Sequence, residues 1–257
     1  MTPITIAVAG KGGTGKTTTC GMLIDYLAKS GHGPILAVDA DPNANLNEVL
    51  GVSVDMTLGD IRENIARSDI AVPSPIPSGM TKQEYAEIMF NSALTEEDDY
   101  DLLVMGRTQG KGCYCYVNGV LKAQIEKYAG NYRYVVVDNE AGLEHISRGT
   151  LPSVDILLLI SDCSRRGIQA VGRIRQMVDE LGLKPKQMKL IVNRAPAGIL
   201  DEGIQEEIRQ QQLELLGVLP DDDTVYQYDC AGKPSALVPA QTPIKRALLG
   251  CIKELNL

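Results

Sequence analysis

The sequence lacks a membrane-length apolar run, a dense set of cysteines and a cluster of histidines. No uninterrupted apolar stretch reaches the roughly 20 residues that a transmembrane helix needs, and the apolar start at 4–10 is too short for a signal peptide. Six cysteines in 257 residues do not resemble a secreted disulfide framework, so we expect free thiols in a reducing cytoplasm. The only histidines are His32 and His145, so no histidine cluster is available to complete a metal site built on cysteine thiolates.

Basic residues are also too few for a nucleic-acid-binding surface. The chain has 25 Lys and Arg against 33 Asp and Glu, a formal charge of −8, and no strong basic cluster. Apolar residues recur at helical spacing in segment 242–257, but its polar face mixes basic and acidic side chains. We therefore expect a final helix packed on the core, and neither nucleic acid nor a membrane as a partner.

Short apolar runs alternate with helical patterns along the chain. Strands are predicted at 4–10, 34–41, 101–106, 132–138, 154–161, 188–193 and 214–220. The runs are largely apolar, as expected of strands buried on both faces of a sheet. They predict an α/β fold: one domain over residues 1–257, with a mostly parallel sheet of about seven or eight strands flanked by helices on both faces. Two helix boundaries carry their own signals, a stop near Gly31 and a start at Thr81 with Glu84 at capping-box spacing.

The segment GKGGTGKT, residues 10–17, fits the phosphate-binding motif G-x-x-x-x-G-K-[ST] and lies between a predicted strand and a predicted helix. Its glycines let backbone amides close around phosphate oxygens, and the N-terminus of the following helix adds partial positive charge. Lys16 is predicted to reach the β- and γ-phosphates, and Thr17 to ligate Mg²⁺. The predicted nucleotide-binding residues of this loop are Gly12, Gly13, Thr14, Gly15, Lys16, Thr17 and Thr18.

A second lysine, Lys11, makes the loop resemble the deviant Walker A motif K-G-G-x-G-K-[ST] of the MinD/ParA/nitrogenase-iron-protein class. In that class the first lysine contacts the phosphates of the nucleotide bound by the partner subunit. The resemblance implies an ATPase that binds ATP or ADP with Mg²⁺ and forms an ATP-dependent homodimer, in which Lys11 and Lys16 both serve catalysis.

Carboxylates follow two of the predicted strands, at the edge where ligands gather in open α/β sheets. Asp39 and Asp41 lie in VDADPNANL, and Asp138 lies in VVVDNEAGLEH. Asp39 is placed to support Mg²⁺ through a water molecule. The resemblance implies that Asp41 is a catalytic first-switch residue that orients the attacking water. It also implies that Asp138 assists Mg²⁺ in the second switch, where the amide of Gly142 senses the γ-phosphate.

Asn193 ends a predicted strand, and its amide offers both a donor and an acceptor to the edge of a base. The resemblance implies that an asparagine here contacts adenine, and that the segment VLPDDD, with Pro220 and Asp221, covers the base. An asparagine in an ordinary turn is the alternative at this position.

Cys113 and Cys115 lie one residue apart between Gly112 and Gly119. In extended backbone, side chains two residues apart face the same way, so both sulfurs could bind one ion. A tetrahedral thiolate site needs four ligands, and a two-fold axis would supply the second pair, giving one ion per dimer. Thiolates suit Zn²⁺, Ni²⁺, Cu⁺ or an iron–sulfur cluster, and the residues do not choose among them. Four other cysteines fall singly and are predicted to pack as small apolar residues: Cys20, Cys163, Cys230 and Cys251.

The lysine-bearing loop, the Cys-Tyr-Cys pair and the segment AGLEHISRGT, residues 141–150, together resemble a narrower family over residues 4 to about 220. This family is the CooC/AcsF-type nickel-insertion ATPases of carbon monoxide dehydrogenase and acetyl-CoA synthase. The resemblance implies an ATP-dependent metallochaperone that holds Ni²⁺, or Zn²⁺, at Cys113 and Cys115 and serves one of these nickel–iron–sulfur enzymes. Three residues of the segment have no derived role: Glu144, His145 and Arg148. An iron–sulfur carrier or ATP-dependent reductase of the same superfamily is the main alternative, ahead of a ParA- or MinD-like partition or positioning ATPase.

Overall fold

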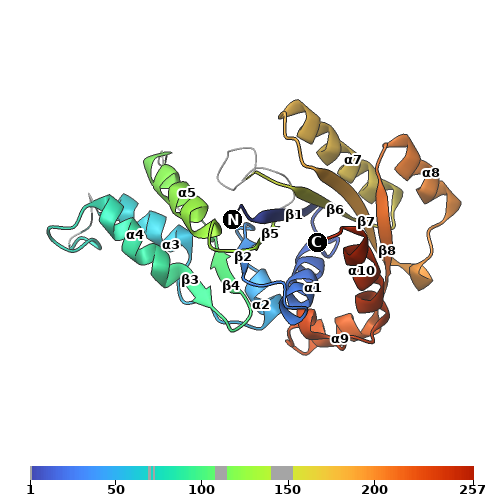
Figure 1. The fold of residues 1–257 in the computed structure, drawn as a ribbon, viewed down its shortest axis with the longest axis horizontal. Coiled ribbons are helices and arrows are strands. Elements are labelled where there is room, and N and C mark those ends of the chain that lie inside the picture. Colours follow the sequence, from blue (N-terminus) through green and yellow to red (C-terminus); the bar gives the residue numbers. More distant parts are fainter. Residues whose placement is uncertain (1, 69–70, 72, 108–114, 140–152) are drawn as a thin grey trace.

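The computed structural model describes residues 2–68, 71, 73–107, 115–139 and 153–257. Its centre is an eight-stranded sheet with the strand order β3-β4-β2-β5-β1-β6-β7-β8 (Figure 1). The strands are β1 (Ile4–Gly10), β2 (Ile35–Asp39), β3 (Leu94–Glu96), β4 (Asp101–Val104), β5 (Tyr134–Asp138), β6 (Ile156–Asp162), β7 (Gln187–Ala195) and β8 (Leu215–Pro220). Every neighbouring pair is parallel except β3 and β4, which are antiparallel. The predicted fold class is confirmed, and β3 is the one strand of the described residues that the apolar pattern does not indicate.

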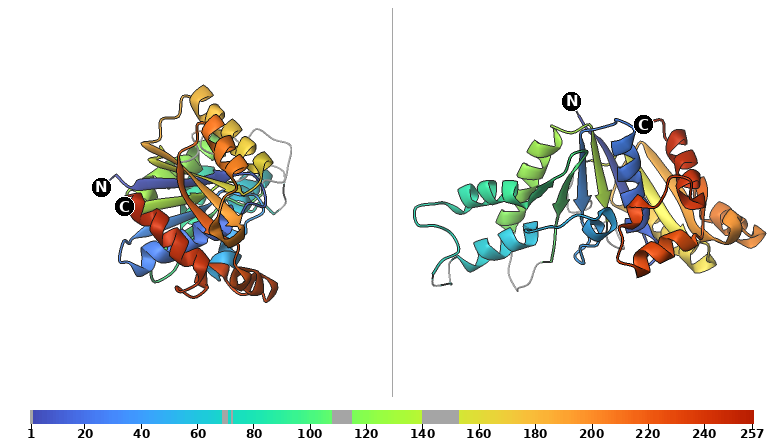
Figure 2. Two further views of the ribbon diagram at one scale, coloured as in Figure 1. Left: turned by 90° about the vertical axis from the view of Figure 1, so that its right-hand side faces the viewer. Right: turned by 90° about the horizontal axis from the view of Figure 1, so that it is seen from below.

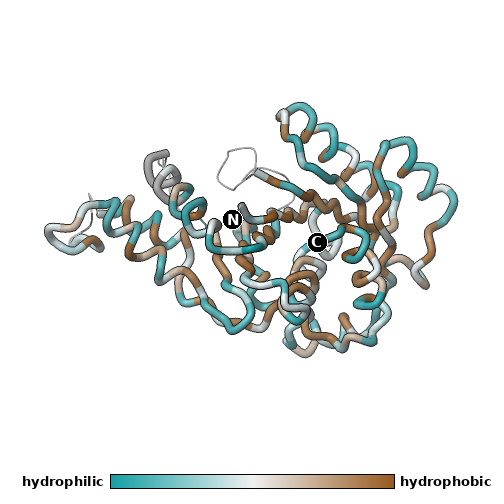
Figure 3. Tube along the Cα trace, viewed as in Figure 1, coloured by the Kyte–Doolittle hydropathy of each residue, from teal (hydrophilic) through white to brown (hydrophobic). Residues whose placement is uncertain are grey.

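Helices cover both faces of this sheet (Figure 2), and the central strands between them are rich in hydrophobic residues (Figure 3). Ala7 and Ala9 of β1 belong to the apolar cluster on one face, and Ile6 and Val8 to the cluster on the other. This alternation explains why the runs are apolar along their whole length. The first cluster includes residues of α3 (Leu58–Arg67), α4 (Lys82–Ala93), α5 (Cys115–Ala129), α7 (Arg165–Glu180) and α8 (Glu202–Gln210). The second includes residues of α1 (Lys16–Lys29), α2 (Leu46–Leu50) and α10 (Pro243–Glu254), and α9 (Asp223–Cys230) packs against it.

The predicted helix boundaries are confirmed by their capping contacts. At the start of α4, the Thr81 hydroxyl accepts a hydrogen bond from the Glu84 amide at 3.1 Å, and the Glu84 carboxylate accepts one from the Thr81 amide at 2.8 Å. α1 ends at Lys29, and the left-handed Gly31, with φ 71°, follows. The final helix, α10, packs its apolar side on the core as predicted. No helix in the described part of the chain is long and apolar enough to span a membrane.

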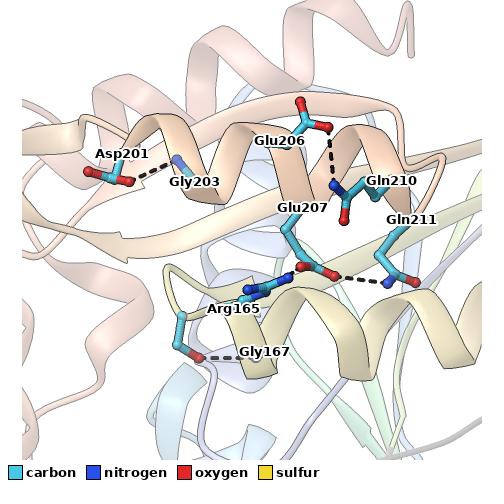
Figure 4. Close-up of polar contacts among 9 residues, drawn as sticks. Arg165, Gly167, Asp201, Gly203, Glu206, Glu207, Gln210 and Gln211 are labelled. Atoms are coloured by element: carbon cyan, nitrogen blue, oxygen red, sulfur yellow. Dashed lines mark hydrogen bonds and ion pairs between the residues drawn. The ribbon is translucent and has the colours of Figure 1, made fainter.

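A buried carboxylate fixes α8 against α7 (Figure 4). Glu207 of α8 is only 3% exposed, and it accepts hydrogen bonds from Nε2 of Gln211 at 2.9 Å and from Nε of Arg165 at 2.6 Å. These contacts hold the pKa of Glu207 below its usual range, with Gln211 contributing the larger effect. Because α8 leads into β8, the contacts help to fix the strand whose far end reaches the site described below.

The single cysteines differ in burial. Cys20 and Cys251 are buried as predicted, and burial raises the pKa of the Cys20 thiol well above its usual value. Cys163 is partly buried, and its thiol donates to the carbonyl oxygen of Arg194 at 3.3 Å. Cys230 is exposed, so the prediction that it packs as a small apolar residue is wrong: it ends α9, a short helix that buries none of its residues.

Candidate nucleotide site

The carboxyl ends of the central strands lie level with one another. In register, Val8 of β1 lies beside Asp138 of β5, which lies beside Asp39 of β2, which lies beside Val104 of β4. The loops that follow these four strands therefore begin at one edge of the sheet. Since they lead to the predicted P-loop, both predicted switches and the paired cysteines, the topology gathers these predicted sites at that edge.

The loop between β1 and α1 has a backbone that only glycine fits at two positions. Gly15 has a left-handed φ of 87°, and a Cβ there would lie 2.3 Å from Nδ2 of Asn193. A Cβ at Gly10 would lie 2.1 Å from the carbonyl oxygen of Ile160 in the neighbouring strand. The motif spacing predicts glycines here, and the structure adds the reason: the loop is pressed against β6 and β7.

The two lysines of this loop have different surroundings. Lys16 is 7% exposed, and its ammonium donates to the carbonyl oxygen of Lys11 at 3.3 Å. The hydroxyl of Thr14 donates to the same carbonyl at 2.9 Å and closes the loop into a compact turn. Lys11 itself is exposed. Lys16 thus lies within the loop, whereas Lys11 is open to contact from another molecule.

Asp39 organises the segment that follows β2. Its buried carboxylate accepts hydrogen bonds from the amides of Asp41 at 3.0 Å and Leu46 at 2.9 Å. Burial raises the pKa of Asp39 to about 6, although these backbone hydrogen bonds act in the opposite direction. Asp41 accepts a hydrogen bond from the amide of Asn43 at 2.8 Å and is only partly buried. Asp39 therefore shapes the predicted first switch, and Asp41 keeps access to solvent.

Asp138 is 1% exposed, yet neither of its carboxylate oxygens accepts a hydrogen bond of normal geometry from the described residues. Burial raises the pKa of Asp138 to about 7; the nearby Thr17 hydroxyl and Lys16 ammonium offset part of this shift, and the charge of Asp39 adds to it. A bound cation would compensate the two buried carboxylates. Carboxylate and hydroxyl oxygens are ligands that Mg²⁺ prefers, so the residues present fit the predicted Mg²⁺ site.

A cavity of about 390 Å³ opens between the P-loop, the ends of β7 and β8, and α9. Its lining includes the three residues that are predicted to contact the base, Asn193, Pro220 and Asp221. It also includes Gly15 and Thr18, which are predicted to bind phosphate. The side-chain amide of Asn193 donates to the carbonyl oxygen of Thr14 at 2.9 Å, so here it bonds to the P-loop, and its contact with adenine stays a prediction.

Sequence reasoning misses most of the lining of this cavity. The further residues are Arg194, Asp222, Asp223, Val225, Tyr226, Asp229, Ser235 and Ile244. Arg194 directly follows Asn193, and Asp222 and Asp223 complete the VLPDDD segment itself. Val225, Tyr226 and Asp229 come within six residues after that segment, and this proximity is the signal that could have found them. Ser235 and Ile244 come from a short 3₁₀ turn and from α10, which carry no such signal.

The cysteine pair and the second switch lie only partly within the described residues. Cys115 is the first residue of α5, and Cys113 lies outside the described residues. Gly142 of the second switch also lies outside them, as do three residues of the AGLEHISRGT segment, Glu144, His145 and Arg148.

The segment that leads toward the cysteines is described as far as Arg107. It leaves β4 at the edge that also holds the P-loop, because β4 runs parallel to β2. The guanidinium of Arg107 donates to the side-chain oxygen of Asn43, in the loop that follows β2. This hydrogen bond ties the start of the cysteine-bearing segment to the predicted first switch.

Comparisons with known proteins agree with this geometry. A family model described as the CobQ/CobB/MinD/ParA nucleotide binding domain matches residues 5–235. An uncharacterized ATP-binding protein of Methanocaldococcus jannaschii is 42% identical over 239 residues, 93% of each chain. The carbon monoxide dehydrogenase accessory protein CooC of Rhodospirillum rubrum is 29% identical over 257 residues, 97% of this chain and 96% of CooC. The septum site-determining protein MinD of Pyrococcus horikoshii, solved with Mg-ADP, shares the fold with a TM-score of 0.71 and 22% identity, over 100% of this chain and 96% of that one.

Proposed function

The chain belongs to the CobQ/CobB/MinD/ParA family of nucleotide-binding domains and is an ATPase, and from this premise we propose that it is an ATP-dependent nickel metallochaperone. Its homodimer holds one Ni²⁺, or Zn²⁺ in its place, between Cys113 and Cys115 of the two subunits. The metal is passed to a nickel–iron–sulfur enzyme, carbon monoxide dehydrogenase or acetyl-CoA synthase. The predicted resemblance to the MinD/ParA class is confirmed, and the metal, the dimer and the client belong to the proposal.

One arrangement carries the metal part of the proposal: the P-loop and the cysteine-bearing segment begin at the same edge of the sheet. Only β2 and β5 separate β1, which leads to the P-loop, from β4, which leads to the cysteines. If ATP joins two such edges through the exposed Lys11 of each chain, the two cysteine pairs meet at the same interface. Each chain offers one pair of thiols, so a four-ligand site needs both chains.

The phosphate end of the site uses the residues described above. Lys16 and the loop amides bind the β- and γ-phosphates, and Thr17, Asp39 and Asp138 hold Mg²⁺, which when bound neutralises phosphate charge. The partly exposed carboxylate of Asp41 accepts a hydrogen bond from the attacking water and directs it at the γ-phosphate. The 390 Å³ cavity beside the P-loop receives the nucleoside.

Delivery requires that the metal be bound more tightly in one nucleotide state than in the other. Shifting a site from nearly full to nearly empty takes an affinity ratio of about 10⁴ between the two states. The hydrogen bond between Arg107 and Asn43 offers a route for this coupling, because it joins the cysteine-bearing segment to the first switch. The 29% identity over nearly the whole chain to CooC, a carbon monoxide dehydrogenase accessory protein, supports carbon monoxide dehydrogenase as the client.

Anaerobic titration with Ni²⁺, followed by metal analysis and light scattering with and without an ATP analogue, tests the proposal. We expect half an ion per chain and a dimer promoted by metal. The Cys113→Ser/Cys115→Ser double variant should lose the ion and keep ATP binding, whereas Cys230→Ser, which removes an exposed lone thiol, should match the wild type. One ion per chain on a monomer, or unchanged metal content in the double variant, would refute it. Visible absorption of an iron–sulfur cluster in the anaerobically purified protein would favour the carrier or reductase instead.

A further inference from the structure

The end of β7 contains a local irregularity beside the P-loop. Val192 pairs with Val218 of β8, and the next pair is Ala195 with Pro220. Between these two pairs β7 therefore contains one more residue than β8. The extra residue is accommodated at Arg194, which has a left-handed φ of 56°. A bulge of this kind bends a strand and re-aims its side chains.

The bulge turns two consecutive side chains toward the same loop. In a regular strand Asn193 and Arg194 would point to opposite faces of the sheet. Here Nδ2 of Asn193 donates to the carbonyl oxygen of Thr14 at 2.9 Å, and Nη1 of Arg194 donates to that of Gly13 at 3.1 Å. Two neighbouring carbonyls of the P-loop are therefore held by two neighbouring side chains of β7.

The unusual backbone of Arg194 is held from both sides. Its amide donates to Oδ1 of Asn193 at 2.9 Å, and its carbonyl oxygen accepts the thiol of Cys163 at 3.3 Å. A non-glycine residue keeps a left-handed φ only where its surroundings stabilise that conformation. The contacts of the guanidinium, the amide and the carbonyl together provide such surroundings.

Holding a carbonyl fixes the amide on the other side of the same peptide plane. The carbonyl of Gly13 shares its plane with the N–H of Thr14, and the carbonyl of Thr14 shares its plane with the N–H of Gly15. A phosphate-binding loop works by aiming such N–H groups at phosphate oxygens. We propose that Arg194 is a positioning residue of the ATPase: it orients the Gly13–Thr14 peptide so that the N–H is preset for phosphate, as Asn193 does for the next peptide.

This role predicts which kinetic constants depend on Arg194. A preset loop stabilises every nucleotide that places a phosphate in it, so ADP and ATP should lose affinity equally without the guanidinium, and turnover of bound ATP should change little. Direct contact of Arg194 with the reacting phosphate would have the opposite signature, a loss of kcat with nearly unchanged ADP binding. Direct contact with the nucleoside, in the cavity that Arg194 also lines, would weaken adenosine as much as ADP, whereas the positioning role leaves the affinity for adenosine unchanged.

The test measures binding of MgADP and of a non-hydrolysable ATP analogue by calorimetry, with steady-state ATPase kinetics, on three variants. Arg194→Gly removes the side chain and accommodates the left-handed backbone, so we expect the Kd of both nucleotides and the KM to rise about five- to tenfold, with kcat within twofold. Arg194→Ala removes the same guanidinium and also strains the left-handed backbone, so this variant should bind both nucleotides more weakly than Arg194→Gly does. Arg194→Lys keeps a cationic donor and should recover part of the affinity.

Arg209→Ala is the matched control, because it removes an exposed arginine whose partner, Glu206, lies on α8 away from the P-loop. It should leave all constants unchanged. Wild-type affinity in Arg194→Gly would overturn the proposal, and so would a fall in kcat without a rise in Kd. If the Gly variant unfolds, the Lys variant decides the question: a loss confined to kcat would overturn the proposal, and a parallel rise in both Kd values would support it.

Discussion

Asp138 shows at the scale of one residue what the sequence predicts and what it does not. The run VVVD predicts a carboxylate at a strand end, and the structure places it there, beside Asp39. The pattern does not reveal that Asp138 is buried without a hydrogen-bond partner among the described residues, because its surroundings come from strands far away in the sequence. The same holds for Gly10 and Gly15, whose close neighbours belong to β6 and β7.

Replacing Asp138 by asparagine should stabilise the nucleotide-free protein at alkaline pH. The pKa of this carboxyl is about 7 in the folded chain and about 3.9 in an unfolded one. Between these values the folded state binds more protons, so the wild type loses stability as the pH rises. We expect Asp138→Asn to raise the free energy of unfolding at pH 8 by about 1–3 kcal/mol, and by less at pH 5.

Thermal unfolding at the two pH values, without nucleotide or divalent cation, measures this effect. Asp98→Asn, at an exposed carboxylate, is the control and should show no pH-dependent gain. A variant of Asp138 that is no more stable than the wild type at pH 8, or a gain that is equal at both pH values, would contradict the burial argument.

Asp41 allows a second test in which the shape of the loop is preserved. Asp41→Asn keeps an oxygen for the hydrogen bond from the Asn43 amide, but it removes the charge proposed to orient water. We expect ATP turnover to fall about 100-fold or more while the Kd for MgADP stays within twofold. Lys16→Ala, by comparison, should lose nucleotide binding itself. Equal ATPase rates in the wild type and Asp41→Asn would rule out the role proposed for Asp41.

Elements were predictable where one short stretch of sequence determines them. The apolar runs predict seven strands, and the Thr81 capping box predicts the start of α4. β3 is not predictable this way, because three residues at the sheet edge are too few to show a period. The bulge in β7 and the contacts between α7 and α8 depend on residues that are distant in the sequence, so no local sequence pattern predicts them.

Removing the Glu207 carboxylate should loosen α8 from α7. Glu207→Ala leaves the Arg165 guanidinium and the Gln211 amide without their shared acceptor, so we expect a lower thermal midpoint at pH 7. Because the pKa of Glu207 is lowered in the folded chain, its contribution is present at neutral pH and is lost as the pH falls through that lowered value.

The neighbouring residue Glu206 supplies the control for this prediction. It is exposed and contacts Arg209 and Gln210 of its own helix, so Glu206→Ala should change the midpoint much less than Glu207→Ala. Circular dichroism melts of both variants at neutral and acidic pH make the comparison. Equal midpoints for the two variants at pH 7 would show that the contacts drawn in Figure 4 do not hold α8 in place.

The whole molecule is organised around one edge of its sheet. The helices α3, α4 and α5 lie at one end of the molecule and α7 and α8 toward the other, with α1 and the P-loop between them (Figure 1). Sequence reasoning predicts this gathering of sites, because carboxyl ends of parallel strands share an edge. It does not predict how two such edges would meet, since that depends on surfaces contributed by two folded chains.

Lys11 tests the dimer at this scale. Lys11→Gln should weaken dimerisation with a non-hydrolysable ATP analogue about tenfold or more and leave ADP binding by the monomer nearly unchanged, because Lys16 serves the chain's own nucleotide. Light scattering and calorimetry provide the two readouts. Lys186→Gln is the control, since this 80% exposed lysine pairs with Asp155 just before β6, at the opposite edge. Normal analogue-driven dimerisation of Lys11→Gln would contradict the cross-subunit role.

The position of β1 also constrains how the protein is made. β1 is synthesised before the other strands of its sheet, but its neighbours in the sheet are residues 134–138 and 156–160, and the carbonyls of the P-loop that follows it are held by Asn193 and Arg194. At about 5 to 20 residues per second, roughly 6 to 25 seconds pass between the synthesis of β1 and that of β5, and roughly 10 to 40 seconds pass before Arg194 is made. Until β5 is made, the nascent chain carries an apolar strand without either of its sheet neighbours. Until Arg194 is made, the P-loop lacks a side chain that holds its carbonyls, so we expect full nucleotide affinity only from chains translated beyond Arg194.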